Sequence, residues 1–218
     1  MPLTFLITLG PTREYIDPVR FLSNASSGKM GKALIEEALK LNCKVIAVKG
    51  PCTAEIKKSK NCKIVDVISA SDMLNAVKKN LNFSDVFIGA AAVSDYRPVT
   101  VAKNKIKKQD CTTDYINLKL VKNPDIIKYV SEHKKNQIVV GFALETKNLI
   151  SYAKKKLKQK NLDIIVANEV SAISAQKSVA TLLFKNKKEK KLKLSSKQKV
   201  AKEIINESIA VFKNNKTC

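Results

Sequence analysis

The chain has 218 residues, 44% of them hydrophobic, which is enough for one sizeable domain with its own core but short for two. No apolar run approaches the roughly 20 residues that a membrane span needs, and the N-terminus lacks a basic region and a small-residue cleavage site, so we expect a cytoplasmic protein without a membrane partner. The net charge of +22 comes almost entirely from lysine without interleaved aromatic residues, and we expect solvated surface and no nucleic-acid partner.

Apolar runs rich in β-branched residues alternate along the chain with segments whose apolar residues recur at helical spacing. The predicted strands cover residues 3–9, 44–48, 63–68, 86–91, 137–143 and 163–167. The predicted helices cover residues 31–41, 72–81, 125–132 and 147–160. This alternation is typical of an α/β fold, and we expect a Rossmann-like, doubly wound and mostly parallel sheet.

The last part of the chain departs from this pattern. Residues 179–184 and 191–194 look like an antiparallel pair, and Ser196 is a candidate cap for a final helix that runs to about residue 212. We therefore expect a small C-terminal antiparallel element beside the parallel sheet. The sequence has no internal repeat, no Gly/Ser linker and no clear domain boundary, so residues 1–218 are expected to form a single domain.

Glycine is scarce in this chain, and several glycines stand where predicted strands end. Gly10 follows the first strand, while Gly28 and Gly31 open the helix after it. In an open α/β sheet the ligand crevice lies outside the carboxyl ends of the strands, and glycine lets a phosphate approach the backbone there. Gly28 and Gly31 are candidates for such a site, whereas Gly50, which precedes Pro51, is better explained by a turn.

Residues 26–31 place two serines and two glycines at a helix start, where unpaired N–H groups and the positive end of the helix dipole suit an anion. The segment follows neither the P-loop pattern nor the dinucleotide fingerprint, and Ser26 could simply cap the helix. The only arginines, Arg13, Arg20 and Arg97, stand near the same edge. Their planar forks suit either a carboxylate or phosphate ligand or the holding of loops, and both interpretations stay open.

A second cluster follows the fourth predicted strand. Residues 90–92 are small alanines that allow backbone contact with a ligand, and Asp95 closes the segment. From about residue 97 to residue 113 the chain has little to bury, yet it carries several closely spaced lysines. This segment is predicted to be either a lid that closes over phosphates or a basic surface loop.

Several of these segments form motifs that follow one another in a fixed order. They are GPTRE (10–14), IDPVRFLSNASSGKMG (16–31), AAVSDYRP (91–98), KIKK (105–108), VKNPD (121–125), VGFALET (140–146) and KNLD (160–163). Through them the chain resembles bacterial phosphopantothenate-cysteine ligases over roughly residues 5–170. The stretch after Val170 is similar only in its general pattern. The motifs begin near the start of the sequence, so we expect the stand-alone bacterial type without a decarboxylase domain.

The resemblance implies ligation of 4'-phosphopantothenate to L-cysteine in coenzyme A biosynthesis. Members of this family use CTP and Mg²⁺, and they pass through an acyl-cytidylate intermediate to give 4'-phosphopantothenoyl-L-cysteine, CMP and pyrophosphate. A homodimer is implied, in which the small antiparallel element or the loop from Arg97 builds the interface, and a separate decarboxylase acts next in the pathway. The resemblance leaves the metal ligands unassigned. It further implies a phosphate-binding first half over residues 1–95 and a lysine-rich lid over residues 97–113.

The resemblance also implies roles for individual residues. The catalytic lysine of the family matches Lys105, ten residues after Asp95, where it also contacts the nucleotide, and the catalytic asparagine matches Asn24, which contacts the acyl group of the substrate. Further substrate-binding positions match Ala91, Ala92 and Asp95. The nucleotide-binding positions match Gly10, Ser26, Gly28, Gly31, Asp95, Val121, Lys122, Asn123, Pro124, Phe142, Lys156 and Lys160.

One residue departs from the bacterial pattern, because Leu144 stands where a second alanine is common and is expected to narrow the pocket.

Two alternatives to the ligase function stay open. Tyr152 and Lys156 satisfy the YxxxK spacing of short-chain NAD(P)-dependent reductases, although the glycine fingerprint of a dinucleotide site is absent. A basic nucleic-acid-binding module is the third interpretation. His133, the only histidine, has no predicted role.

The five cysteines are odd in number, widely spaced and without a CxxC pair. This pattern favours neither a disulfide framework nor a zinc site, and we expect reduced thiols.

Overall fold

The computed structural model describes residues 2–107, 115–145, 148–169 and 177–216. Its central feature is an eight-stranded sheet with the order β12-β11-β10-β9-β6-β1-β4-β5. Six strands are parallel, namely β1 (Thr4–Leu9), β4 (Lys44–Lys49), β5 (Cys62–Asp66), β6 (Val86–Gly89), β9 (Ile138–Glu145) and β10 (Ile164–Glu169). The predicted α/β class and mostly parallel sheet are therefore confirmed.

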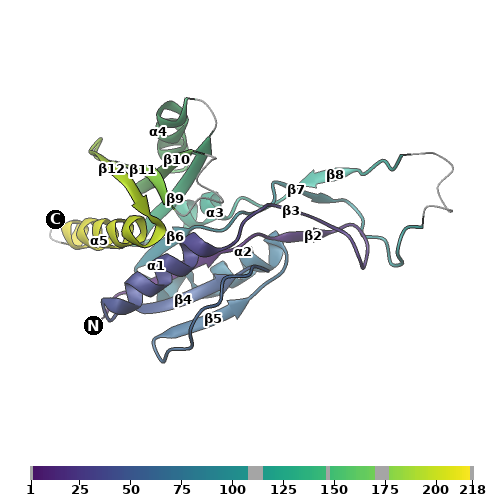
Figure 1. Cartoon of the computed structure of the whole chain (residues 1–218), viewed down its shortest axis with the longest axis horizontal. Coiled ribbons are helices and arrows are strands. Elements are labelled where there is room, and N and C mark those ends of the chain that lie inside the picture. Colours follow the sequence, from purple (N-terminus) through teal and green to yellow (C-terminus); the bar gives the residue numbers. More distant parts are fainter. Residues whose placement is uncertain (1, 108–114, 146–147, 170–176, 217–218) are drawn as a thin grey trace.

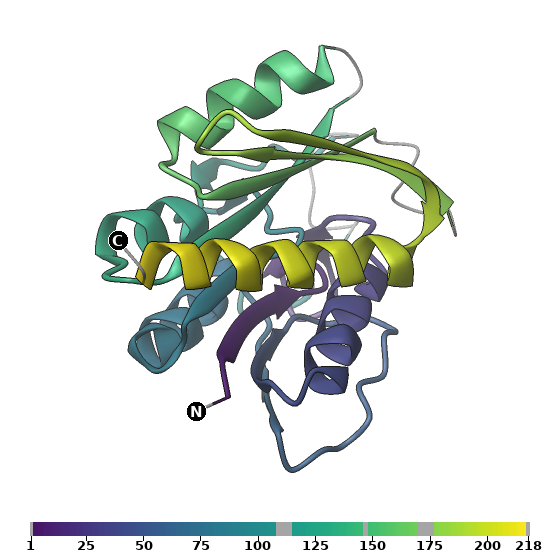
Figure 2. The same ribbon diagram turned by 90° about the vertical axis from the view of Figure 1, so that its left-hand side faces the viewer.

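Helices cover both faces of this sheet (Figures 1 and 2). One face buries α1 (Lys29–Lys40) and α5 (Lys197–Lys216), which pack against each other. The other face buries α2 (Ala70–Asn80), α3 (Ile126–His133) and α4 (Leu149–Gln159), with the 3₁₀ turn η1 (Leu81–Phe83) after α2. Strand β1 is almost fully buried, as expected for a central parallel strand between two helical layers.

The strand order reverses beside β1. The chain runs from β1 outward through β4 to β5, and then returns to the other side of β1 with β6. Loops after β1 and β6 therefore diverge to opposite faces of the sheet at their carboxyl ends. In doubly wound folds this switch point opens the crevice in which ligands bind.

The C-terminal antiparallel element is confirmed. Strand β11 (Lys177–Phe184) pairs antiparallel with both β10 and β12 (Glu189–Ser196), and so extends the main sheet. The hydroxyl of Ser196 accepts a hydrogen bond from the Lys199 amide at 3.4 Å, consistent with the predicted cap. Helix α5 then continues to Lys216, beyond the predicted end near residue 212.

Two small antiparallel sheets form an arm that projects from the sheet, on the right in Figure 1. Strand β2 (Arg13–Tyr15) pairs with β3 (Phe21–Ser23), and β7 (Tyr96–Pro98) pairs with β8 (Leu120–Lys122). The sequence predicted no strands here, because three-residue strands are too short to show a period. The lid or surface loop predicted from about residue 97 begins instead within strand β7, and residues 108–113 lie outside the described residues.

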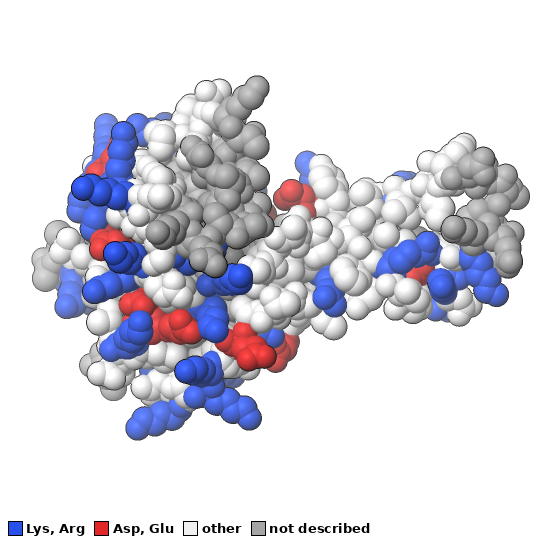
Figure 3. Space-filling model, in the orientation of Figure 1, with Lys and Arg blue, Asp and Glu red and all other residues white. Residues whose placement is uncertain are grey.

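The surface chemistry follows the composition. Lysine and arginine side chains are scattered over the visible face of the body and along the arm, with acidic side chains between them (Figure 3). Within the described residues, no helix combines the length and apolar character needed to cross a membrane. Cys43, Cys52 and Cys62 are free thiols, while Cys111 and Cys218 lie outside the described residues.

Candidate functional site

Two cavities open at the carboxyl end of the parallel strands, one on each face of the sheet. The α3–α4 cavity has a volume of about 500 Å³ and is lined from β6, residues 122–127 and α4. The α1–α5 cavity has a volume of about 540 Å³ and is lined by residues 24–31, residues 90–93 and the first residue of α5. The two cavities share Ala91, Val93, Asp95, Phe142 and Lys156, and therefore adjoin at these residues.

The N-terminus of α1 forms one wall of the α1–α5 cavity. Gly28 caps the helix with φ +74°, a left-handed conformation that disfavours other residues, and no side chain caps the helix. Gly31 packs on β1 so closely that an added Cβ would lie 2.3 Å from the Cβ of Leu9. Ser26 stands at the loop end, where its hydroxyl accepts a hydrogen bond from the Gly28 amide at 3.4 Å. The first N–H groups of α1 are thus left for an anion.

Asn24 lines the same cavity and is tied to the loop after β6. Its side-chain amide donates a hydrogen bond to the carbonyl of Ala92 at 3.2 Å, and the Ala92 amide donates to the Gly10 carbonyl at 2.9 Å. An asparagine side chain carries two N–H donors, so one remains for a ligand. The loops after β1 and β6 are thereby joined at the point where the predicted substrate residues meet.

Gly10 contributes its backbone carbonyl to this contact between the loops but lies outside both cavities. It has φ +77°, and an added Cβ would lie 2.9 Å from the Gly50 carbonyl oxygen and 3.1 Å from the Cys52 Cβ. Gly10 lines neither cavity. Its glycine character is explained by the close approach of the loops after β1 and β4, and its predicted nucleotide contact stays a prediction.

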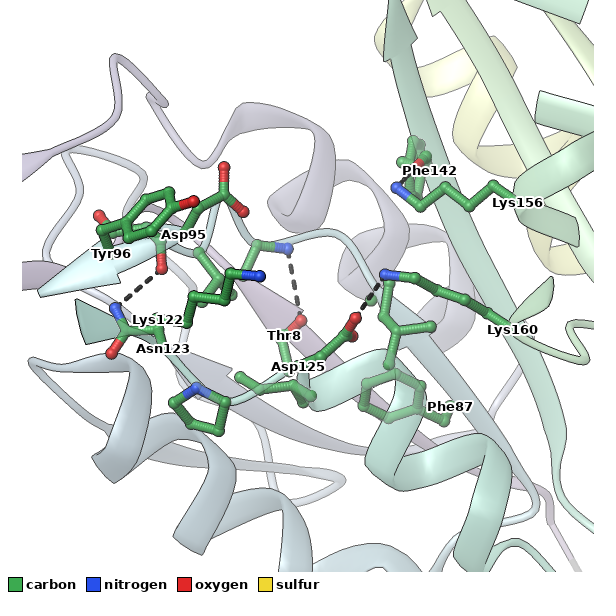
Figure 4. A pocket seen from close by; sticks show the side chains of 17 residues that line it. Thr8, Phe87, Asp95, Tyr96, Lys122, Asn123, Asp125, Phe142, Lys156 and Lys160 are labelled. Atoms are coloured by element: carbon green, nitrogen blue, oxygen red, sulfur yellow. Dashed lines mark hydrogen bonds and ion pairs between the residues drawn. The ribbon is translucent and has the colours of Figure 1, made fainter. Parts of the chain in front are cut away.

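The α3–α4 cavity is lined by lysines and by backbone of the segment before α3 (Figure 4). Lys156 Nζ donates to the Phe142 carbonyl oxygen at 2.7 Å, and Lys160 Nζ pairs with Asp125 Oδ2 at 2.7 Å. Burial alone would raise the pKa of Asp125. The Lys160 partner and the hydrogen bond from the Lys128 amide lower it by more, so the pKa of Asp125 lies below its usual value. Asp125 is therefore anionic and holds Lys160 at the cavity wall.

Residues 122–124 are held rigidly in this wall. The amide of Asn123 donates to the Asp95 carbonyl at 2.8 Å, and its side chain donates to the Ser94 carbonyl at 2.8 Å. Arg97 Nη1 donates to the Lys122 carbonyl at 2.9 Å and to Asn123 Oδ1 at 3.1 Å. The guanidinium of Arg97 thus holds two strands of the arm together, which is one of the two roles that the sequence left open.

Asp95 and Phe142 stand where the two cavities meet. Both line both cavities, and Asp95 is exposed to solvent. Most of the other predicted binding residues are also brought together here. Ala91, Lys122, Asn123, Pro124, Lys156 and Lys160 line the α3–α4 cavity, and Asn24, Ser26, Gly28, Gly31, Ala91, Ala92 and Lys156 line the α1–α5 cavity.

Lys105 and Val121 are not brought into either cavity. Val121 lies in β8, opposite Arg97, and is 40% exposed. Lys105 is exposed on the arm, next to Ile106, whose backbone contacts Asp17 and Arg20. In one copy of the chain the predicted catalytic lysine therefore stands apart from the residues that it would serve.

Asn168 and Lys197 are among the lining residues that the sequence reasoning missed. Asn168 lies one residue before the end of β10 with 4% of its surface exposed, and its Oδ1 has no hydrogen-bond partner within the described part of the chain. Lys197 begins α5, where burial and the neighbouring charge of Lys29 lower its pKa. A polar residue at the end of a buried strand could have indicated Asn168, whereas nothing local indicates Lys197. Leu144, the departure from the family pattern, lines the same cavity.

The described residues contain no group of three or more His, Cys, Asp or Glu side chains that could hold a metal ion. Asp95 is the carboxylate that both cavities share. A single carboxylate suits a Mg²⁺ ion that takes its other ligands from water and from the phosphates of a nucleotide.

Known proteins match this chain over most of its length. The family model described as "DNA/pantothenate metabolism flavoprotein C-terminal domain" matches residues 2–211. The coenzyme A biosynthesis bifunctional protein CoaBC of Bacillus subtilis (strain 168) is 45% identical over 212 residues, which are 95% of this chain and 51% of that protein. CoaBC of Haemophilus influenzae is 46% identical over 211 residues, with the same coverage. The chain thus spans about half the length of the curated relatives it matches.

Solved structures show the same fold. The crystal structure of the C-terminal domain of CoaBC has a TM-score of 0.82 and 40% identity, and covers 96% of this chain and 95% of that one. A flavoprotein structure from Streptococcus pneumoniae, whose name also includes DNA/pantothenate metabolism, has a TM-score of 0.83 and 27% identity, with 96% and 99% coverage. The complex of a Cab2 mutant with phosphopantothenate-cysteine has a TM-score of 0.80 at 20% identity, with 99% and 88% coverage, and supports the fold alone.

Proposed function

Because the chain belongs to the family of DNA/pantothenate metabolism flavoprotein C-terminal domains, we propose that it joins 4'-phosphopantothenate to L-cysteine, with CTP as the energy source. The reaction is a step of coenzyme A biosynthesis in the cytoplasm. One observation carries the proposal. The N-terminus of α1, which suits phosphates, lines one cavity, and residues 122–124, which suit the edge of a base, line the other. The two cavities meet at Asp95 and Phe142. A nucleotide placed across both would have its α-phosphate at the junction.

The first half-reaction forms a mixed anhydride. A carboxylate oxygen of phosphopantothenate attacks the α-phosphorus of CTP, the bond to the β-phosphate breaks, and pyrophosphate leaves with the bonding electrons. Negative charge grows on the α-phosphate, so a cation there lowers the barrier. Lys105 is proposed for this role, while the first turn of α1 holds the leaving phosphates.

The second half-reaction forms the amide. The neutral amine of L-cysteine attacks the acyl carbon, the bond to the phosphate oxygen breaks, and CMP leaves while the amine proton passes to solvent. The acyl oxygen gains negative charge during the attack, and a fixed N–H donor would stabilise it. Asn24 is proposed as this donor, because its hydrogen bond to the Ala92 carbonyl orients the side chain at the cavity.

Mg²⁺ would enter with the triphosphate, where it neutralises phosphate charge. Asp95 is the proposed protein ligand, since its exposed carboxylate lies where the cavities meet. Phe142 offers an apolar contact at the same place.

The reductase alternative is not favoured. Its YxxxK pair needs both side chains in one site, but Tyr152 is 50% exposed and lines neither cavity, whereas Lys156 lines both. The nucleic-acid alternative would predict salt-dependent binding of random DNA without nucleotide turnover.

The assay that tests the proposal measures pyrophosphate from the purified chain with phosphopantothenate, cysteine and Mg²⁺, with CTP or ATP added separately. We expect release with CTP that depends on both phosphopantothenate and Mg²⁺. No release with either nucleotide would refute the ligase proposal, and release with ATP alone would refute the assignment of CTP.

We further propose a homodimer built through the arm. The arm exposes an unusual number of large apolar side chains, among them Val19, Tyr96, Val99, Val101, Leu118 and Leu120, which are 39–58% exposed. A second copy that covered them would bury apolar surface and bring its own Lys105 to the cavities of the first. The alternative, in which Lys105 folds back over its own cavities, would have to break the contacts of Ile106 with Asp17 and Arg20.

Mixing two inactive variants distinguishes these arrangements. In a mixed dimer of Lys105→Gln and Asn24→Asp chains, one of the two sites has both residues intact only if Lys105 comes from the partner. We expect about a quarter of the parental activity after random reassociation, because about half of the dimers are mixed and each has one intact site. No recovery in a mixture shown to exchange subunits would place Lys105 in its own chain's site. A mass near 24 kDa by light scattering would refute the dimer itself.

A further inference from the structure

Asp17 lies at the centre of the contact that fixes the segment carrying Lys105, although no role in the reaction has been assigned to it above. It stands in the turn between β2 and β3, and none of its surface is exposed to solvent. A buried aspartate is costly unless its oxygens are paired, so the groups around Asp17 indicate what it holds.

Both carboxylate oxygens of Asp17 are used. Oδ1 accepts hydrogen bonds from the amides of Val19 and Arg20, each at 2.8 Å, which fixes the turn. Oδ2 accepts from Arg20 Nε at 2.9 Å and Nη2 at 2.5 Å, and also from the Ile106 amide at 3.2 Å. The contact with Ile106 spans 89 residues of sequence. It joins the β2–β3 turn directly to the residue after Lys105.

Arg20 also binds the backbone of Ile106. Its Nη2 donates to the Ile106 carbonyl at 2.8 Å, so the Asp17–Arg20 pair holds both the N–H and the C=O of one residue. A third bond, from the Ala102 amide to the Ile16 carbonyl at 2.9 Å, aligns the segment further back. The backbone on the C-terminal side of Lys105 is therefore held by an ion pair whose Asp17 carboxylate is buried and whose Arg20 side chain is 42% exposed. The Arg20 partner and the amides hold the pKa of Asp17 well below its usual range, so the carboxylate stays charged.

We propose that Asp17 is a positioning residue for the first half-reaction: through Arg20 and the Ile106 backbone it sets the place from which Lys105 reaches the α-phosphate. The inference rests on the proposed function of Lys105. A flexible lysine on an unfixed loop would pay conformational entropy each time it met the phosphate, and a displacement of about 1 Å from the productive geometry can cost about a hundredfold in rate. Asp17 touches neither cavity, so its effect should be confined to the step that uses Lys105.

The test is Asp17→Asn, which keeps the size of the side chain and removes the charge that binds Arg20 and Ile106. We expect CTP-dependent pyrophosphate release to fall about 10- to 100-fold at saturating substrates. The dissociation constant for CTP and the rate at which isolated acyl-cytidylate reacts with cysteine should stay near parental values. Hydrogen exchange should show lost protection in a peptide that covers residues 102–107.

Asp163→Asn is a matched control. Asp163 is also buried, accepts a hydrogen bond from the Val139 amide at 2.8 Å and pairs with Lys134 at 2.6 Å. It lies just before β10, away from the arm. Its substitution should lower the melting temperature without slowing pyrophosphate release by the folded protein or changing exchange at residues 102–107.

The outcomes separate this inference from the proposed function. If Lys105→Gln is inactive but Asp17→Asn releases pyrophosphate at the parental rate, the positioning role is refuted. Equal slowing of both half-reactions in Asp17→Asn would also refute it. So would a monomeric mass of this variant in light scattering, and Asp17 would then act in folding or assembly. A fully active Lys105→Gln variant would instead remove the proposed role of Lys105, whatever Asp17 does.

Discussion

The substitution Lys105→Gln is expected to abolish formation of the acyl-cytidylate. Glutamine keeps a polar side chain of similar reach but removes the cation that opposes charge on the α-phosphate before any intermediate exists. Loss of one group that stabilises developing charge costs about 10²- to 10³-fold, and a full charge in a desolvated site costs more. Pyrophosphate release that depends on CTP should therefore fall to background, as measured with a coupled assay in a single turnover.

Lys103→Gln provides the matched control, because Lys103 is exposed in the same segment two residues earlier. This variant should release pyrophosphate at nearly the parental rate, with only the small loss expected when one surface charge stops steering anionic substrates. Abundant release from Lys105→Gln would overturn the assignment. The role would then pass to Lys103 or Lys107, and a complete loss with Lys103→Gln would identify the former.

Asn24→Asp is expected to stop the reaction one step later. The change keeps the size of the side chain but replaces an N–H donor with a carboxylate that is anionic at neutral pH, beside an acyl oxygen that gains negative charge when the amine attacks. Removing one such donor typically costs about 10²- to 10³-fold in rate, and an added negative charge should not lessen the cost. Since activation depends on Lys105 and the α1 N-terminus, acyl-cytidylate should still form and accumulate.

A rapid-quench single turnover with labelled phosphopantothenate, CTP and cysteine measures this, with chromatography of the acyl species. Asn24→Ala controls for the added charge, because it removes the same donor to the Ala92 carbonyl without placing a carboxylate there. It should also accumulate intermediate. If Asn24→Asp forms product at the parental rate, the side chain serves only to join the loops after β1 and β6.

The sequence predicted the body of the fold because the long elements bury regular apolar faces. Strand β1 is a continuous apolar run and helix α1 repeats its buried residues at helical spacing, so the positions of both could be assigned locally. The arm could not be predicted in this way. Strands β2, β3, β7 and β8 have three residues each, and β7 meets β8 only after a long intervening segment. Their pairing depends on tertiary contacts that leave no period in the sequence.

In the candidate site, too, the features encoded by neighbouring residues could be predicted and those that depend on tertiary contacts could not. Gly28 and Gly31 could be placed at the start of α1 because the signals of a helix start are local. Lys197 reaches the α1–α5 cavity only because α5 packs beside α1, across more than half of the chain, and no short pattern encodes that contact. The separation of Lys105 from the cavities was also invisible in the sequence, where the lysine is only ten residues from Asp95.

The position of β1 in the sheet also matters for handling the protein on a surface. Parallel strands share one direction, so the amino end of β1 lies at the edge of the sheet opposite the cavities, and α5 runs toward the same side (Figure 1). A tag, fluorophore or solid support attached near the amino end of β1 or the carboxyl end of α5 would therefore lie away from both the cavities and the arm. Tethered protein should keep its substrate access, and a fluorophore at one end would report rotation of the whole particle rather than events at the site.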